Sequence, residues 1–173
     1  MKRLALLRHA KSDWDAGASS DFDRPICDEG RTAAQAMGRY IKHSCGEYRH
    51  ALVSPARRCC ETFDAVCCEF DEAPEKVLED RIYLASAGTL LELVQAQDDG
   101  FDELLLVGHN PGLTFLALDL IRLDDNVSDR ERIAAKFPTA GFVQLECDVS
   151  HWSDVCSSGC DLKLRRYPIE ELS

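Results

Sequence analysis

Long apolar runs are missing from this sequence. No segment approaches the ~18 apolar residues that a membrane-spanning helix needs. The start, MKRLALLRHA, places basic residues before an apolar run as a secretory signal does, but Arg8 ends that run after residues 4–7, whereas a signal peptide needs an apolar core of about 7–15 residues. We therefore expect a cytoplasmic protein without a membrane partner.

Positive charge is also scarce. The chain has 20 lysine and arginine residues against 31 aspartate and glutamate residues, which gives a formal net charge of −11. A protein with this balance repels a nucleic-acid backbone and an anionic membrane surface. We therefore exclude nucleic acid as the main partner, and any site that binds an anion must be a local feature.

The nine cysteines lack the even count and the secretory context of a disulfide framework. The pairs Cys59-Cys60 and Cys67-Cys68 suggest a zinc site, but this stretch has the pattern of a helix. Residues seven apart on a helix are separated by about 10.5 Å along its axis, whereas each thiolate on one zinc ion lies about 2.3 Å from the metal. We therefore predict buried helix thiols and no metal site.

Short apolar runs predict a sheet within one domain. The chain shows no internal repeat or low-complexity tract, and 173 residues with 45% apolar composition can form one domain, residues 1–173. Two of the runs are unbroken enough to be buried on both faces. The predicted strands are 3–8, 51–54, 104–107, 142–147 and 162–167.

Segments with helical spacing lie between these strands. Ala33, Met37 and Ile41 form one apolar stripe behind a possible cap at Asp28, and residues 90–94 form another. This alternation of strand and helix predicts an α/β domain with a mostly parallel sheet. The charged stretch 124–136 is predicted to be a surface connection or a helix.

Two strand-to-helix junctions have residues typical of helix starts. In "VSPARR" Ser54 can cap a helix with Pro55 at its first position, and in "GHNPGL" Asn110 and Pro111 can do the same. The amide groups and the dipole at a helix N-terminus favour a bound anion. Both junctions are therefore candidate anion sites.

Arginine and histidine gather at three predicted strand ends: Arg8 with His9, Arg57 with Arg58, and His109 alone. In open α/β sheets the binding crevice lies beyond the carboxyl ends of the strands. If these strands are parallel neighbours, two imidazoles and up to three guanidinium groups meet in one cleft. Because side chains alternate along a strand, Arg8 and His9 can both face this cleft only if the pleat breaks there.

This set of residues suits a phosphoryl group. Guanidinium groups bind phosphate oxygens bidentately and keep their charge, and a neutral imidazole can attack phosphorus when one ring nitrogen is held by a hydrogen bond. Each residue alone has a plainer interpretation, as a structural histidine or a solvated arginine; their joint placement favours a site. We predict that His43, His50 and His151, which lack this context, lie on the surface.

The motifs resemble those of the histidine phosphatase superfamily, also called phosphoglycerate mutase-like. The matching segments are "RHAKSDW", "DRPICDEG", "SPARRCCET", "LEDRIYLAS" and "VGHNPG", in the family's order, over about residues 3–115. The resemblance is greatest to the short SixA-type phosphohistidine phosphatases. It implies a three-layer α/β/α sandwich around a mostly parallel central sheet.

The resemblance also implies roles for individual residues. His9 matches the histidine that the family phosphorylates, Arg8 its phosphate-binding neighbour, Arg58 the arginine of S-P-x-x-R, and His109 the second histidine of the pocket. Arg24, in D-R-P, matches a further phosphate or substrate contact.

The general acid and the remaining substrate contacts are less closely matched. Asp80 occupies the position of the mutases' glutamate acid, one methylene shorter, and Asp21 is the alternative acid. Asp21 is also expected to bind substrate, together with Ser12 and Asn110. Neither a metal nor a cofactor is expected.

Three functions follow as hypotheses. The first is a metal-independent phosphatase that forms a phosphohistidine intermediate on His9, with a phosphohistidine-bearing protein as its expected partner and substrate. The second is a phosphatase or phosphomutase acting on a small phosphorylated metabolite; a chain this short has no room for the lid that a mutase needs, and an open cleft is expected. The third is a phosphate-binding module without turnover.

Overall fold

The computed structural model describes residues 1–46, 48–123 and 127–168. Its strands form one six-stranded sheet in the order β3-β2-β4-β1-β5-β6. The pairs β1–β4, β2–β4 and β2–β3 are parallel, and β5 runs antiparallel to both β1 and β6. The strands are β1 Lys2–Arg8, β2 His50–Val53, β3 Glu75–Leu78, β4 Glu103–Gly108, β5 Phe142–Cys147 and β6 Cys160–Arg166.

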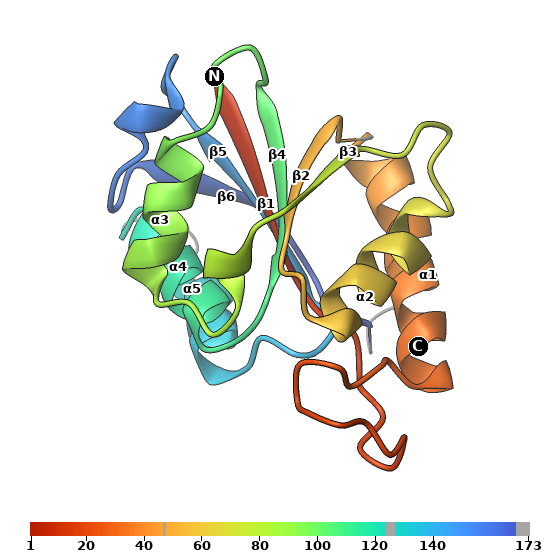
Figure 1. Ribbon diagram of the computed structural model, residues 1–173. Helices are drawn as coiled ribbons and strands as arrows, with labels where there is room; N and C mark the ends of the chain where they lie inside the picture. The colour runs from red at the N-terminus through yellow and green to blue at the C-terminus, as the bar shows by residue number, and fades with distance from the viewer. Residues whose placement is uncertain (47, 124–126, 169–173) are drawn as a thin grey trace.

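Helices cover both faces of this sheet, so the molecule has the three layers expected (Figure 1). One face carries α1 (Asp28–Ser44) and α2 (Arg57–Cys67). The other carries α3 (Ala87–Gln95), α4 (Gly112–Leu120) and α5 (Val127–Ala135). Two short 3-10 helices, η1 (Asp80–Ile82) and η2 (Trp152–Asp154), complete the described elements.

The alternation of side chains along β1 produces the two cores. Leu4 and Leu6 pack with residues of α3 and α4, whereas Ala5 and Leu7 pack with residues of α1 and α2. All four are fully buried, which explains why this strand is an unbroken apolar run.

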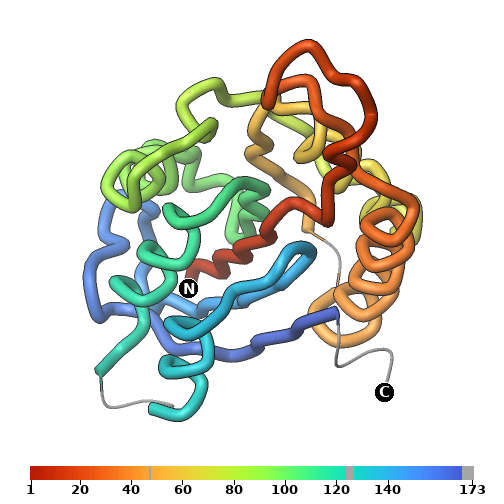
Figure 2. The backbone as a smooth tube through the Cα atoms, turned by 90° about the horizontal axis from the view of Figure 1, so that it is seen from below, coloured from red at the N-terminus to blue at the C-terminus, as the bar shows by residue number. Residues whose placement is uncertain are grey.

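The carboxyl ends of β1, β2 and β4 lie side by side. Leu7 and Val53 both pair with Val107 of β4, the central strand of the three. Figure 2 views the molecule from this end, where the red loop after β1 leaves the sheet before α1 begins. The residues that follow these three strands therefore share one edge of the sheet.

The sequence predicts five of the six strands, although β6 begins two residues earlier than expected. It misses β3, an exposed edge strand of sequence EKVL without an apolar face. The predicted helix or surface connection at 124–136 contains α5; residues 124–126 lie outside the described residues.

The predicted helix caps are wrong in detail. Helix α2 starts at Arg57 with Ala56 as its N-cap, and α4 has Pro111 as its N-cap; neither cap makes a side-chain hydrogen bond. The N-cap of α1 is Cys27, whose sulfur accepts from the Gly30 amide, and Asp28 is the first helical residue. Ser54 and Asn110 instead bond to groups near the strand ends, described below.

The prediction that the three remaining histidines lie on the surface is wrong for His50. His50 is buried, stacked on Phe101 with its Nε2 3.0 Å from Gln97 Oε1, whereas His43 and His151 are exposed as expected. Ring stacking and one polar partner make burial of an imidazole favourable.

The cysteine prediction is correct only in part. Cys59 and Cys67 are buried in α2, but Cys68 at its end is exposed. Cys147 and Cys160 form a disulfide, because the β5–β6 register places them opposite each other. Within the described ranges, no group of three or more histidine, cysteine or acidic residues could hold a metal ion, and no helix is long and apolar enough to span a membrane.

Candidate active site

The pleat of β1 breaks where the site requires it. The strand ends at Arg8, and the His9 amide still donates to Gly108 O at the end of β4. The backbone oxygens of Arg8 and His9 both accept from the amide of Ala140, which turns the chain out of the ladder. His9 therefore lies beyond the last regular strand position, free of the alternation that would separate it from Arg8.

His9 is held as a neutral imidazole with one free nitrogen. Its Nδ1 lies 2.8 Å from the Ala10 carbonyl; because a carbonyl only accepts, Nδ1 carries the proton and Nε2 a lone pair. Burial lowers the pKa of His9 to about 4, and the charges of Arg58, Arg8 and Arg24 act in the same direction. At neutral pH the ring therefore has an unprotonated nitrogen available for attack.

His109 lies directly beyond β4, with its ring centroid 5.3 Å from that of His9. Its Nε2 is 2.8 Å from Ser54 Oγ, and its Nδ1 is 3.3 Å from Arg58 Nη2. Burial lowers the pKa of His109 to about 3, and the neighbouring His9 ring and the charge of Arg58 act in the same direction. Both histidines are therefore neutral and face one another across the strand ends.

The two adjacent arginines of α2 have opposite surroundings. Arg58 is 4% exposed and donates to Asp21 O at 2.6 Å and to Asp21 Oδ2 at 3.0 Å. Arg57 is 57% exposed and pairs with Glu61 one turn along the helix. Arg58, which the resemblance matches to the arginine of S-P-x-x-R, is thus the buried one of the two.

Asp21 organises the cationic groups of the site. It accepts from Arg24 at 2.5 Å and from the Tyr83 hydroxyl at 2.9 Å, besides its bond from Arg58. The bond from Arg24, together with those from Tyr83 and Arg58, holds the pKa of the Asp21 carboxyl well below its usual range. This carboxylate is ionised throughout the neutral range.

Arg24 itself is buried on the loop that precedes α1. It donates to Ser12 Oγ, and its guanidinium carbon lies 3.6 Å from the ring centre of Trp14, an exposed side chain. The predicted substrate-binding residues Ser12, Asp21 and Arg24 thus form one hydrogen-bonded group on the loop between β1 and α1.

Asn110 and Arg8 share one acceptor. Asn110 Nδ2 donates to Phe137 O at 2.9 Å, and Arg8 Nη1 donates to the same oxygen at 2.8 Å. A cavity of about 640 Å³ adjoins Arg8 between α1 and residues 136–139, but neither histidine lines it. Asn110 therefore anchors the turn after His109 next to Arg8.

Asp80 has no such connection to the other residues. It is exposed at the first position of η1, and its carboxyl forms no hydrogen bond or ion pair with any residue that the structure describes.

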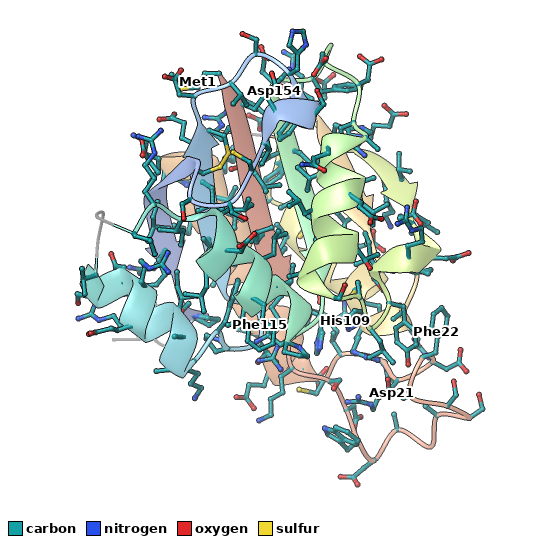
Figure 3. All side chains as sticks on the ribbon, turned by 90° about the vertical axis from the view of Figure 1, so that its left-hand side faces the viewer. Met1, Asp21, Phe22, His109, Phe115 and Asp154 are labelled. Atoms are coloured by element: carbon teal, nitrogen blue, oxygen red, sulfur yellow. A yellow bond between two sulfur atoms is a disulfide. The ribbon has the colours of Figure 1, made fainter. Side chains whose placement is uncertain are left out.

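Figure 3 shows Asp21, Phe22, His109 and Phe115 together at one end of the molecule, opposite Met1 and Asp154. Among the carboxylates of the described residues, Asp21 alone bonds to Arg24 and Arg58.

Sequence reasoning missed three contributors. Tyr83 packs edge-on against His109 with 5.4 Å between ring centroids. Thr62 Oγ1 accepts from the Ala10 amide at 2.8 Å and donates to Arg58 O at 2.6 Å, which ties α2 to the His9 segment. Ser54 contacts His109. All three residues lie within the motif segments "SPARRCCET" and "LEDRIY", and this position is the feature of the sequence that could have identified them.

The combined arrangement is cationic and lined with donors. Two neutral imidazoles and the guanidiniums of Arg24 and Arg58 converge on one strand-end edge, with Arg8 beside them and one carboxylate, Asp21, among them. Such a site favours a tetrahedral dianion such as a phosphoryl group.

Comparison with known proteins agrees with this chemistry. The model of the histidine phosphatase superfamily (branch 1) matches residues 4–83. A protein of Mycobacterium tuberculosis with uncharacterized function is 34% identical over 155 residues, which cover 89% of this chain and 94% of that protein. The chain belongs to the histidine phosphatase superfamily, a family of phosphatases.

Solved histidine phosphatases share the whole fold. A protein of Agrobacterium tumefaciens that carries the name phosphohistidine phosphatase SixA is 28% identical, with a TM-score of 0.80 over 96% of this chain and 98% of that one. A SixA-named protein of Nakamurella multipartitia has a TM-score of 0.84 at 24% identity, covering 97% and 96% of the two chains. The fold is thus that of SixA-type histidine phosphatases.

Proposed function

We propose that this histidine phosphatase hydrolyses phosphohistidine on proteins through a covalent phosphohistidine intermediate on His9. The proposal is supported by the neutral His9 ring with its free Nε2, by the guanidiniums around it, and by the SixA-type fold of the chain. It assigns substrate and residue roles that go beyond membership of the family.

The first half-reaction transfers the phosphoryl group to His9. Nε2 of His9 attacks phosphorus in line, a new N–P bond forms, and the bond from phosphorus to the leaving nitrogen breaks with its electron pair moving to that nitrogen. Arg8, Arg24, Arg58 and His109 bind the three equatorial oxygens, on which negative charge is spread. In the second half-reaction water attacks the phosphorus and His9 leaves as the imidazole.

One observation carries the choice of substrate: among the residues that the structure describes, no carboxyl group of the site is able to donate a proton. Asp21 is kept ionised by Arg24, Arg58 and Tyr83, and no contact ties Asp80 to the described residues of the pocket. An alkyl phosphate needs a general acid for its leaving oxygen, worth about 10²–10⁴-fold. A phosphohistidine protonated on its ring leaves as a neutral imidazole and needs none.

A three-substrate comparison tests this proposal. We expect kcat/KM to be highest for a phosphohistidine peptide, lower for an aryl phosphate such as p-nitrophenyl phosphate, and lowest for glycerol phosphate, by at least about 10²-fold below the peptide. Turnover should persist in EDTA, since arginine and histidine supply the charge that a metal would provide. Comparable rates on glycerol phosphate and the peptide would contradict the substrate assignment.

A further inference from the structure

Ser54 lies against the ring nitrogen of His109 that faces away from Arg58. It is fully buried at the end of β2, and its Oγ is 2.8 Å from His109 Nε2. The same oxygen accepts weakly from the amide of Ala56 at 3.4 Å. A hydroxyl that accepts through its lone pair can direct its proton elsewhere, here to Nε2.

The other ring nitrogen is the one available to a ligand. His109 Nδ1 is 3.3 Å from Arg58 Nη2, and the same Nη2 donates to Asp21 Oδ2 at 3.0 Å. Each ring nitrogen has one in-plane direction for a hydrogen bond, and Ser54 occupies that of Nε2. A phosphoryl oxygen can therefore receive a hydrogen bond from His109 only through Nδ1.

The tautomer of His109 decides what Arg58 and His109 can do together. With the proton on Nε2, Nδ1 accepts from Arg58 and the two groups satisfy each other. With the proton on Nδ1, two donors converge on the same point, and one anionic oxygen can accept from both. Only the second tautomer makes the pair a phosphoryl clamp.

We infer that Ser54 is a positioning residue that donates its hydroxyl proton to His109 Nε2 and so keeps the catalytic proton on Nδ1 when a phosphoryl group is bound. The inference rests on the proposed function. It gives the serine of the S-P-x-x-R segment a role through His109 instead of the helix cap that its position suggests.

The neighbouring cysteine shows why the hydroxyl matters. Cys59 Sγ lies 3.5 Å from the same Nε2 and 3.7 Å from Gly108 O, toward which its S–H points. Burial raises the pKa of the Cys59 thiol to about 12, so it stays neutral, and a thiol is a weak donor and a weak acceptor. In Ser54→Ala only this sulfur remains beside Nε2, and the preference for Nδ1–H is lost.

Ring ¹⁵N NMR of histidine-labelled protein with bound tungstate, a tetrahedral dianion, reads the tautomer directly. We expect wild-type His109 to show a protonated Nδ1 and an unprotonated Nε2. Ser54→Ala should shift protonation toward Nε2 and lower kcat for p-nitrophenyl phosphate by about 10- to 100-fold, with a smaller change in KM. Ser54→Thr, which keeps the hydroxyl, should restore the Nδ1–H tautomer.

Cys59→Ala provides the matched control, because it opens space beside the same nitrogen without removing the hydroxyl; it should retain the Nδ1–H tautomer. Tungstate that leaves the His9 and His109 signals unchanged would contradict the proposed phosphate site itself. Tungstate binding with an Nε2–H tautomer in the wild type, or an unchanged tautomer and kcat in Ser54→Ala, would overturn the role of Ser54 alone.

Discussion

At the residue scale, chemistry and position in the sequence select most of the candidate residues that the structure brings together. His9, His109 and Arg58 could be selected because each follows a strand end and because the motif spacing distinguishes Arg58 from Arg57. The carboxylate of the site could not be selected from the sequence, because Asp80 and Asp21 are both plausible candidates. The two differ because Asp21 accepts hydrogen bonds from Arg58 and Tyr83, which lie 37 and 62 residues away along the chain. No local pattern encodes these bonds.

The two adjacent arginines provide a sharp test at this scale. Arg58→Ala should lower kcat/KM by about 10²-fold or more, because it removes a buried donor to the phosphoryl oxygens. Arg57→Ala, on the exposed side of the same helix turn, should change kcat/KM less than about threefold, since it loses only a surface ion pair. Steady-state kinetics with p-nitrophenyl phosphate measures kcat/KM of both variants. A larger loss in Arg57→Ala than in Arg58→Ala would contradict the geometry.

The two aspartates should also differ. Asp21→Asn removes the charge that orients Arg24 and Arg58, so we expect kcat/KM to fall by about 10-fold or more on every substrate. Asp80→Asn should leave all rates within about twofold. If Asp80→Asn instead slowed glycerol phosphate selectively, Asp80 would be the general acid and the leaving-group argument would fail.

At the scale of elements, strands were predicted better than helix starts. Buried apolar runs identify β1 and β4 directly, whereas "VSPARR" and "GHNPGL" satisfy a capping pattern while Ser54 and Asn110 bond elsewhere. Tertiary contacts therefore override local propensity at the two junctions that build the site. The close approach of α1 to the His9 segment was equally invisible.

Gly30 allows the close approach of α1 to the His9 segment. A Cβ at this position of α1 would overlap the carbonyl oxygen of Lys11, two residues after His9. Gly30→Ala should therefore lower the free energy of unfolding by about 1–3 kcal/mol and also reduce kcat, because the His9 segment must shift. Gly88→Ala is the control: its Cβ would meet no heavy atom nearer than 3.8 Å, so the variant should gain about 0.5–1 kcal/mol in stability.

Urea denaturation at pH 7.5 and initial rates on the same samples measure both effects. A Gly30→Ala protein with wild-type stability and activity would show that α1 can move away from Lys11 without disturbing His9.

At the scale of the whole molecule, the α/β class follows from the alternation of apolar runs and helical stripes. Two features of the sheet do not follow from this sequence pattern. The exposed edge strand β3 has no periodic apolar residues, and the antiparallel β5–β6 pair, with its Cys147–Cys160 disulfide, depends on a register that only the folded sheet defines.

Two buried neutral histidines should make global stability sensitive to acid. The native pKa values of His9 and His109 are lowered to about 4 and about 3, against about 6.5 in the unfolded chain. Between these values the unfolded state binds more protons, so the free energy of unfolding is maximal above pH 6.5 and falls as pH decreases, by up to about 1.4 kcal/mol per pH unit for each ring.

Urea titrations between pH 7.5 and 4.5 measure this slope. His109→Asn should reduce it by about half, whereas His43→Asn, at an exposed position, should leave it unchanged. A free energy of unfolding that is constant from pH 6.5 to 5 would contradict the neutral, buried state of the two rings.

The central claim is that His9 carries the phosphoryl group during turnover. Rapid acid-free quenching after brief reaction with a ³²P-labelled phosphohistidine peptide, followed by peptide mapping, tests it most directly. The account predicts a label on His9 that is stable in base and lost in acid, and that is absent from His9→Ala, which folds but does not turn over. Label that survives acid, or normal turnover by His9→Ala, would contradict it.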